Sequence, residues 1–348
     1  MKNVSIYFFS FLALFLICIP RTSWAQHESE ATNVAPTTLI TRPVATYSIV
    51  ARDPATGEMG VAVQSHWFSV GSIVTWAQAG VGAVATQSFV EPAYGPLGLE
   101  LMRTGRTAEQ ALKALISTDD NESVRQVGMI DVHGNVAAHT GSSAIRAAGH
   151  YVGENFSVQA NMMENATVWP AMAQAFQNTT GDLADRMLAA LDAAQAEGGD
   201  IRGKQSAAIL IVPGVSTGKP WADKIFDLRV EDHPYPLGEL RRLVRMQRAY
   251  NAMNAGDGYM TTGDVASAIE SYNVAMDLLP DEATNGEAPF WVGVTLVSVD
   301  RVAEGIPYLK RAFVLDARWA ELLQRLPETG LLPSDAALMK RLLDEMKK

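Results

Sequence analysis

Thr46 is the residue of this sequence that raises the first chemical question. It opens TYSIVARD (46–53), a strand-like run that a turn containing Pro and Gly joins to EMGVAVQS (58–65). Threonine is common in strands, so Thr46 can be an ordinary strand residue without any chemistry. The alternative is a nucleophile that becomes active when the chain before it is removed. A threonine hydroxyl needs a base beside it, and a free N-terminus would supply an amine with a pKa of about 8.

The common catalytic and metal-binding motifs are absent from the sequence. It contains no G-x-S-x-G elbow, no H-E-x-x-H pair, no phosphate-binding Walker loop and no dinucleotide-binding glycine run. The six histidines are scattered, and none has a second ligand at metal-binding spacing. We therefore expect neither a metal ion nor another cofactor.

The elements that would position Thr46 alternate between strands and helices. Strand patterns continue in SIVTWAQAGVGAVATQS (72–88), the hairpin VRQVGMIDVHGNVAAHTG (124–141), FSVQANM (156–162), QSAAILIVPG (205–214) and KIFDLRVED (224–232). Helical patterns cover GPLGLELMRTG (95–105), TAEQALKALIS (107–117), WPAMAQAFQ (169–177) and DLADRMLAALDAAQAEGGD (182–200). Thr107 and Gln110 form a capping-box pattern. This order predicts an α+β fold, a four-layer αββα sandwich of two largely antiparallel sheets with helices outside.

Composition limits the classes of partner. The chain has 348 residues, 48% of them hydrophobic, which suffices for one large or two ordinary domains. Its formal net charge of −10 argues against nucleic acid and against an anionic membrane surface, because both favour clustered Lys and Arg.

The N-terminal segment predicts export. Lys2 precedes an apolar run (6–19), and RTSWAQ (21–26) places small residues at a cleavage site after Ala25. Residues 1–25 are thus a predicted signal peptide, and 26–45 a flexible leader of a periplasmic or secreted protein without a stable membrane anchor. The only cysteine, Cys18, leaves with the signal, so the mature chain has no disulfide and no thiol nucleophile.

A composition change after residue 232 predicts a second module, because residues 233–348 are mainly helical in pattern. Within it, Ala268 and Gly305 occupy matching positions of a weak repeat at a spacing of 37 residues (305 minus 268). Small residues at such positions are typical of tetratricopeptide-like helical hairpins, although plain helices with coincidental spacing also fit.

Five successive segments within residues 46–230 resemble the uncharacterised family named domain of unknown function 1028. They are the stretch 46–88, YGPLGLELMRTGRTAEQALKALI, RQVGMIDVHGNVAAHTGS, GHYVGENFSVQANMM and GGDIRGKQSAAILIV. That family is grouped with the N-terminal nucleophile (Ntn) hydrolases. The resemblance implies the αββα sandwich for residues 46–232 and a nucleophile at the first residue of the mature chain, at the start of the first strand.

For this sequence, the resemblance implies that Thr46 is the nucleophile and its freed α-amine the base, provided that the chain is cut between Ala45 and Thr46. His66 lies where some Ntn enzymes carry a basic residue, or is instead a solvated histidine beyond a strand. Asn161 would donate its amide to an oxyanion, or instead cap the following helix. Arg202 would bind a substrate carboxylate, or form a structural ion pair with Asp200. Three further residues would line the same cleft: Ser65, Thr86 and Gln87.

Two functions remain open on the sequence alone. One is an exported amidohydrolase that acts on a small amide or a peptide-derived substrate. The other is a catalytically silent binding protein on an Ntn scaffold, in which the C-terminal helices recruit a peptide or protein partner. A homo-oligomer is compatible with both functions.

Overall fold

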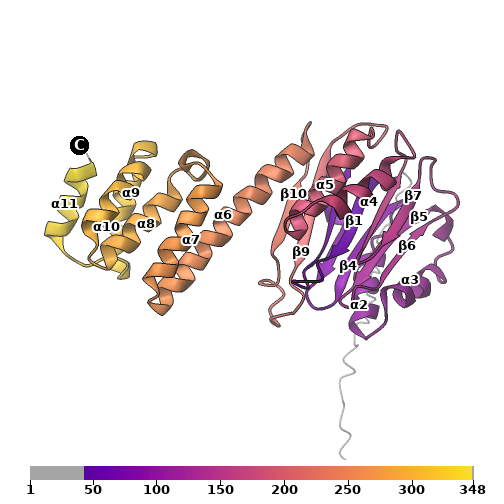
Figure 1. Ribbon diagram of the computed structural model, residues 1–348, viewed down its shortest axis with the longest axis horizontal. Coiled ribbons are helices and arrows are strands. Elements are labelled where there is room, and N and C mark those ends of the chain that lie inside the picture. Colours follow the sequence, from indigo (N-terminus) through magenta and orange to yellow (C-terminus); the bar gives the residue numbers. More distant parts are fainter. Residues whose placement is uncertain (1–42, 347–348) are drawn as a thin grey trace, which may run out of the picture. The chain divides into compact units, whose positions relative to one another are not determined.

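The computed structural model describes residues 43–346, which form two antiparallel sheets and eleven α-helices. The predicted signal peptide and most of the predicted leader, residues 1–42, lie outside the described residues. The six-stranded sheet has the order β10-β9-β2-β1-β8-β7, and the four-stranded sheet the order β3-β4-β5-β6 (Figure 1). The strand bounds are β1 Thr46–Arg52, β2 Met59–Ser65, β3 Thr75–Gln78, β4 Gly82–Ser88, β5 Arg125–Asp131, β6 Val136–Thr140, β7 Gly149–Gly153, β8 Phe156–Asn161, β9 Ser206–Val212 and β10 Phe226–Val230.

The β1–β2 hairpin forms as the sequence predicts, and it lies at the centre of the six-stranded sheet. Asp53 closes its turn by accepting the Ala55 N–H at 2.7 Å, and Gly57 takes the positive φ of 76° that favours glycine. Strand β1 is buried on both faces, and its residues alternate between two apolar clusters. Val50 belongs to the cluster shared with β4, so alternation directs Thr46 towards the four-stranded sheet.

Helices cover both sheets. The pair α4 (Val168–Asn178) and α5 (Leu183–Ala196) contacts β8 and β1 of the six-stranded sheet, and their apolar faces form its largest cluster. The pair α2 (Tyr94–Arg103) and α3 (Ala108–Ile116) contacts β4, β5 and β6 (Figure 1). The predicted capping box begins α3, where Thr107 accepts the Gln110 N–H and the Gln110 side chain accepts the Thr107 N–H.

Two elements differ from the sequence prediction. Residues 71–74 form the short helix α1 (Gly71–Val74) rather than a strand, before β3 begins. Strand β7 was not predicted, because GHYVG has two glycines and no apolar alternation. It is an edge strand that joins its sheet through main-chain pairing with β8, which side-chain patterns do not reveal.

The C-terminal part is helical, as predicted. Small residues let neighbouring helices approach closely here: a Cβ on Gly256 would meet the Tyr272 ring at 2.8 Å, and one on Gly305 would meet the Gly293 carbonyl oxygen at 2.8 Å. The first turns of α6 belong to the β-sheet core, since Leu237, Leu240 and Val244 pack in the cluster of α5 and β9. The bounds are α6 Pro236–Thr262, α7 Val265–Leu278, α8 Glu287–Ser298, α9 Val302–Leu315, α10 Arg318–Arg325 and α11 Ala336–Met346. Within residues 43–346, no helix combines the length and apolarity needed to cross a bilayer.

Candidate functional site

Strand register brings three of the predicted site residues together at one level of the six-stranded sheet. Thr46 at the start of β1 lies opposite Ser65, the last residue of β2, and opposite Asn161, the last residue of β8. All three are fully buried. Residues far apart in the sequence therefore meet at the end of β1 where the preceding chain enters.

The Thr46 hydroxyl is held by two oxygen atoms. Its Oγ1 donates to the Val44 carbonyl oxygen at 2.8 Å and lies 3.3 Å from Ser65 Oγ, within hydrogen-bond distance. In the continuous chain the Thr46 nitrogen is part of the Ala45–Thr46 peptide bond. An amide nitrogen is not basic, so in the continuous chain the Thr46 hydroxyl has no α-amine beside it.

The carbonyl of the Ala45–Thr46 peptide bond accepts two side-chain donors. Ser65 Oγ makes a short hydrogen bond to the Ala45 oxygen, and Arg202 Nη2 donates to the same oxygen at 3.2 Å. A hydroxyl and a guanidinium on one carbonyl oxygen polarise the C=O bond and stabilise negative charge that develops on that oxygen. The arrangement thus favours attack on the Ala45 carbonyl carbon.

Asp200 orients the arginine. Its buried carboxylate accepts Arg202 Nη2 at 2.9 Å and Nε at 3.1 Å, and it also accepts the main-chain N–H of His66 at 2.8 Å. The structural ion pair proposed from the sequence is therefore present, and it holds Arg202 where it reaches the Ala45 oxygen. A paired guanidinium keeps further N–H donors, and here they reach peptide carbonyl oxygens. Binding of a substrate carboxylate by Arg202 stays a prediction.

The end of the predicted leader is packed into the fold. Val44 N–H donates to the Ser88 carbonyl oxygen at 2.6 Å, and Ser88 N–H donates to the Val44 carbonyl oxygen at 3.2 Å. Val44 and Ala45 have no exposed surface, and the Val44 side chain joins the apolar cluster that β1, β2 and β4 share. The chain before Thr46 therefore fills the space beside the Thr46 hydroxyl.

A network of buried amides surrounds Thr46. Gln87 Nε2 donates to the Thr46 carbonyl oxygen at 3.2 Å and to Gln126 Oε1 at 2.7 Å, and Asn161 Nδ2 donates to the same Gln126 oxygen at 3.0 Å. Asn161 does not cap the following helix, whose N-cap is Thr167. Within residues 43–346, Asn161 Oδ1 is buried without a hydrogen-bond partner. Gln126 was not predicted as a site residue, and no local pattern distinguishes it.

His66 and Thr86 lie apart from this cluster in different ways. His66 lines a cavity of about 620 Å³ beside the site, and among the described residues its Nδ1 atom has no hydrogen-bond partner. The other lining residues are Pro43, Trp67, Phe68, Met162, Arg202 and Gln205. Thr86 Oγ1 donates to the Glu91 carbonyl oxygen at 3.0 Å. Alternation along β4 places Thr86 on the same face as Val84, which packs against α2, so the structure does not bring Thr86 to Thr46.

Tyr47 adjoins the site without sharing its chemistry. Burial, followed by the nearby carboxylates of Asp200 and Asp192, raises the pKa of the Tyr47 hydroxyl well above its ordinary value. The hydroxyl donates to Gln195 Oε1 at 3.0 Å. It therefore stays protonated at neutral pH and serves as a neutral donor on the face of β1 that α5 covers.

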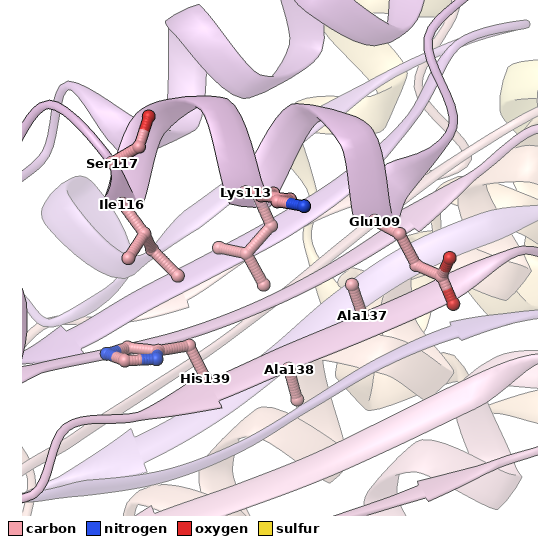
Figure 2. A pocket seen from close by; sticks show the side chains of 8 residues that line it. Glu109, Lys113, Ile116, Ser117, Ala137, Ala138 and His139 are labelled. Carbon is pink, nitrogen blue, oxygen red and sulfur yellow. The ribbon is translucent and has the colours of Figure 1, made fainter.

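A separate hollow of about 330 Å³ lies between α3 and β6. Figure 2 shows Glu109 and Ile116 of α3 on one side of it and Ala137 and His139 of β6 on the other. None of the predicted site residues lines it. In the part of the chain that the structure describes, no three His, Cys, Asp or Glu side chains are placed to hold a metal ion.

Comparison with known proteins places residues 46–240 in one family. The model of the family of unknown function DUF1028 matches this range. The crystal structure of protein SPO2555 from Silicibacter pomeroyi, described as a DUF1028 protein, is 30% identical with a TM-score of 0.52. The match covers 58% of this chain and 88% of that one. No curated protein matches the sequence. The chain therefore belongs to the DUF1028 family, whose function is unknown.

Proposed function

We propose that this protein is an exported amide hydrolase of the N-terminal nucleophile type, with Thr46 as the nucleophile after cleavage of the Ala45–Thr46 bond. The proposed fold is the four-layer αββα sandwich. It is supported by the contacts of β1 with β4, of β5 with β8, and of each sheet with its own pair of helices.

The observation that carries the proposal is the environment of the Ala45 carbonyl. Its oxygen accepts Ser65 Oγ and Arg202 Nη2, while the Thr46 hydroxyl of the same dipeptide is buried at a strand end. One neutral donor would satisfy a buried carbonyl oxygen, whereas the Ala45 oxygen accepts two donors and one of them is a charged guanidinium. Such donors lower the barrier for nucleophilic attack on a carbonyl carbon.

Cleavage would begin with attack of Thr46 Oγ on the Ala45 carbonyl carbon. The hydroxyl proton passes to the departing Thr46 nitrogen, the C–N bond breaks, and an ester joins Ala45 to Thr46 Oγ. Water then hydrolyses this ester, leaving a carboxylate on Ala45 and a free α-amine on Thr46. Ser65 and Arg202 stabilise the oxyanion in both steps.

The freed amine then serves as the base for turnover. It takes the hydroxyl proton as Thr46 Oγ attacks the amide carbon of a substrate, and it delivers that proton to the leaving amine. The C–N bond of the substrate breaks and an acyl ester forms on Thr46 Oγ. Water activated by the same amine hydrolyses the ester and regenerates the hydroxyl. Export by the predicted signal peptide would place this activity in the periplasm or outside the cell.

The mature N-terminus tests the proposal. Protein recovered from its native compartment is analysed by intact mass and end sequencing, together with Thr46→Ser and Thr46→Ala. We expect wild type and Thr46→Ser to begin at residue 46, since serine keeps the hydroxyl, and Thr46→Ala to remain joined at Ala45. A wild-type chain that begins upstream of Thr46 contradicts the proposal, because its hydroxyl would lack the amine.

A second candidate function is a binding protein without catalysis, and one feature of the helices favours it. A pocket of about 450 Å³ lies among them, with the apolar residues Met260, Trp291 and Leu331 and the carboxylate of Asp257 in its lining. A mainly apolar lining with a few polar groups suits a peptide side chain. Unchanged peptide binding in Thr46→Ala, together with an uncut wild-type chain, would favour this function.

A further inference from the structure

The last residues before Thr46 are held through their main chain as a bound peptide would be. The Pro43 carbonyl oxygen accepts Arg202 Nη1 at 3.4 Å, and the Ala45 oxygen accepts Ser65 and the other Arg202 nitrogen. Between them, Val44 forms hydrogen bonds in both directions with the main chain of Ser88, at 2.6 and 3.2 Å. Every carbonyl of the three residues is therefore bonded.

Ser88 has a backbone conformation suited to this pairing. Its φ of +72° lies in the left-handed region, which is strained for a residue other than glycine. Such strain persists only where surrounding contacts impose it, and it concentrates at ligand-binding positions. Met162, which follows Asn161 on the neighbouring strand and lines the cavity, has a φ of +56°. Two strained residues thus flank the space that Pro43–Ala45 occupies.

The side chains of the three residues show what the space accepts. Ala45 is fully buried, so its position admits a small side chain. Val44 is fully buried among the valines of β1 and β2, so its position admits an apolar one. Pro43 is half-buried and lines the 620 Å³ cavity with Trp67 and Phe68. Phe68 is 63% exposed, which leaves an apolar rim at the mouth of that cavity.

This space is also where the acyl group of a substrate must lie, if the proposed function holds. Self-cleavage passes through an ester of Ala45 on Thr46 Oγ. Turnover passes through an ester of the substrate acyl group on the same oxygen. The two esters differ only in what the acyl group carries, so contacts that hold residues 43–45 are available to a substrate after the leader departs.

We propose that the mature protein cleaves extended peptidyl amides, with a small residue at the scissile carbonyl and an apolar residue before it. This inference rests on the proposed function and names its substrate class. The peptide would lie beside Ser88 as Val44 does, with its scissile carbonyl oxygen on Ser65 and Arg202. A simple amide that lacks the residues equivalent to Pro43 and Val44 could neither pair with Ser88 nor fill the apolar subsite.

The test uses the full mature protein whose first residue has been determined. The probe is acetyl-Pro-Val-Ala p-nitroanilide, which copies residues 43–45, and the measurement is kcat/KM from release of nitroaniline. One control is acetyl-Ala p-nitroanilide, which lacks the two preceding residues. A matched control replaces valine by N-methylvaline, which keeps the side chain and puts a methyl group in place of the N–H that would donate to the Ser88 carbonyl oxygen. A third replaces valine by glutamate.

We expect the N-methyl probe to react about ten- to one-hundred-fold more slowly than the parent probe, because a buried acceptor loses its donor. For the glutamate probe we expect kcat/KM to be at least about one hundred-fold lower than for the parent probe, because its carboxylate would enter an apolar subsite without a partner. The short acetyl-alanine probe should also be poor.

A mature chain that begins at Thr46 and does not prefer the tripeptide probe to acetyl-Ala p-nitroanilide overturns this inference and leaves Thr46 chemistry intact. Equal rates for the valine and N-methylvaline probes would show that the substrate does not pair with Ser88, and they too would leave Thr46 chemistry intact. A native chain that begins upstream of Thr46 is the separate failure of the proposed function, because the leader would then still fill the site.

Discussion

Replacing Ser65 by alanine tests the proposed chemistry most directly. The Ser65 hydroxyl donates to the Ala45 carbonyl oxygen and lies 3.3 Å from the Thr46 hydroxyl, so alanine removes one of the two donors on the carbonyl to be attacked. Loss of one such donor slows related reactions by about 10²–10³-fold. That factor corresponds to about 3–4 kcal/mol in the activation barrier. We expect self-cleavage of Ser65→Ala to slow by this factor.

Ser65→Ala should lower the folding stability only slightly, so its effect on the cleavage rate can be distinguished from an effect on folding. Ala45 retains the Arg202 donor, and Thr46 retains its bond to the Val44 carbonyl oxygen, so no buried group loses its only partner. The loss of one buried hydrogen bond should lower the free energy of unfolding by about 1 kcal/mol. In a chain of 348 residues, with an unfolding entropy of about 2.1 cal/mol/K per residue, that shifts Tm by about 1–2 °C.

Ser206→Ala is the matched control. Ser206 lies opposite Ser65 in the adjacent strand β9 and is equally buried, but its hydroxyl bonds Trp67 O and Val70 N rather than the Ala45–Thr46 dipeptide. Ser206→Ala should lower the free energy of unfolding by at least as much as Ser65→Ala does, while cleavage at Ala45–Thr46 proceeds at the wild-type rate.

The assay follows intact mass with time after synthesis of the precursor, with Tm measured on the same samples. Wild-type cleavage in folded Ser65→Ala would refute the argument that the Ser65 donor stabilises the oxyanion. Equal slowing in both serine variants would show that the effect is one of folding.

Three further outcomes follow from the structure. In the mature form, kcat/KM should rise with pH to a plateau above about 8, because the Thr46 α-amine acts only when deprotonated; a profile flat from pH 6 to 9 would exclude that base. Burial opposes ionisation of Asp119, but its bonds with Arg125 outweigh this and hold its pKa below the ordinary value. The carboxylate therefore stabilises the fold above about pH 4, and this contribution is lost as pH falls through the lowered pKa; urea unfolding of Asp119→Asn at pH 3 and pH 7 should show a weaker pH dependence than wild type. Gly82→Ala should cost about 1–3 kcal/mol in chemical denaturation, because its Cβ would meet the Ile130 carbonyl oxygen at 2.3 Å, and an unchanged midpoint would contradict that packing.

Local patterns in the sequence determined most of the elements. Alternation and turn residues predicted the hairpins, and apolar periodicity with a capping box at Thr107 predicted the helices. These signals depend on neighbours within a few positions, so a single sequence displays them. The position of Thr46 at the start of β1 was also determined in this way. Strand β7 was missed because its residues show no apolar alternation and main-chain pairing with β8 places it in the sheet.

Only the tertiary structure decided what surrounds the Ala45–Thr46 bond. Arg202 reaches the Ala45 oxygen from 157 positions away, and Gln126 joins Gln87 and Asn161 through strand register across two sheets. Sequence spacing does not encode such contacts, because they depend on how separate strands align. Nor did composition distinguish Val44, which belongs to a polar segment yet is buried beside Ser88. The physical reason is that burial and pairing are properties of the assembled sheets, whereas periodicity is a property of one segment.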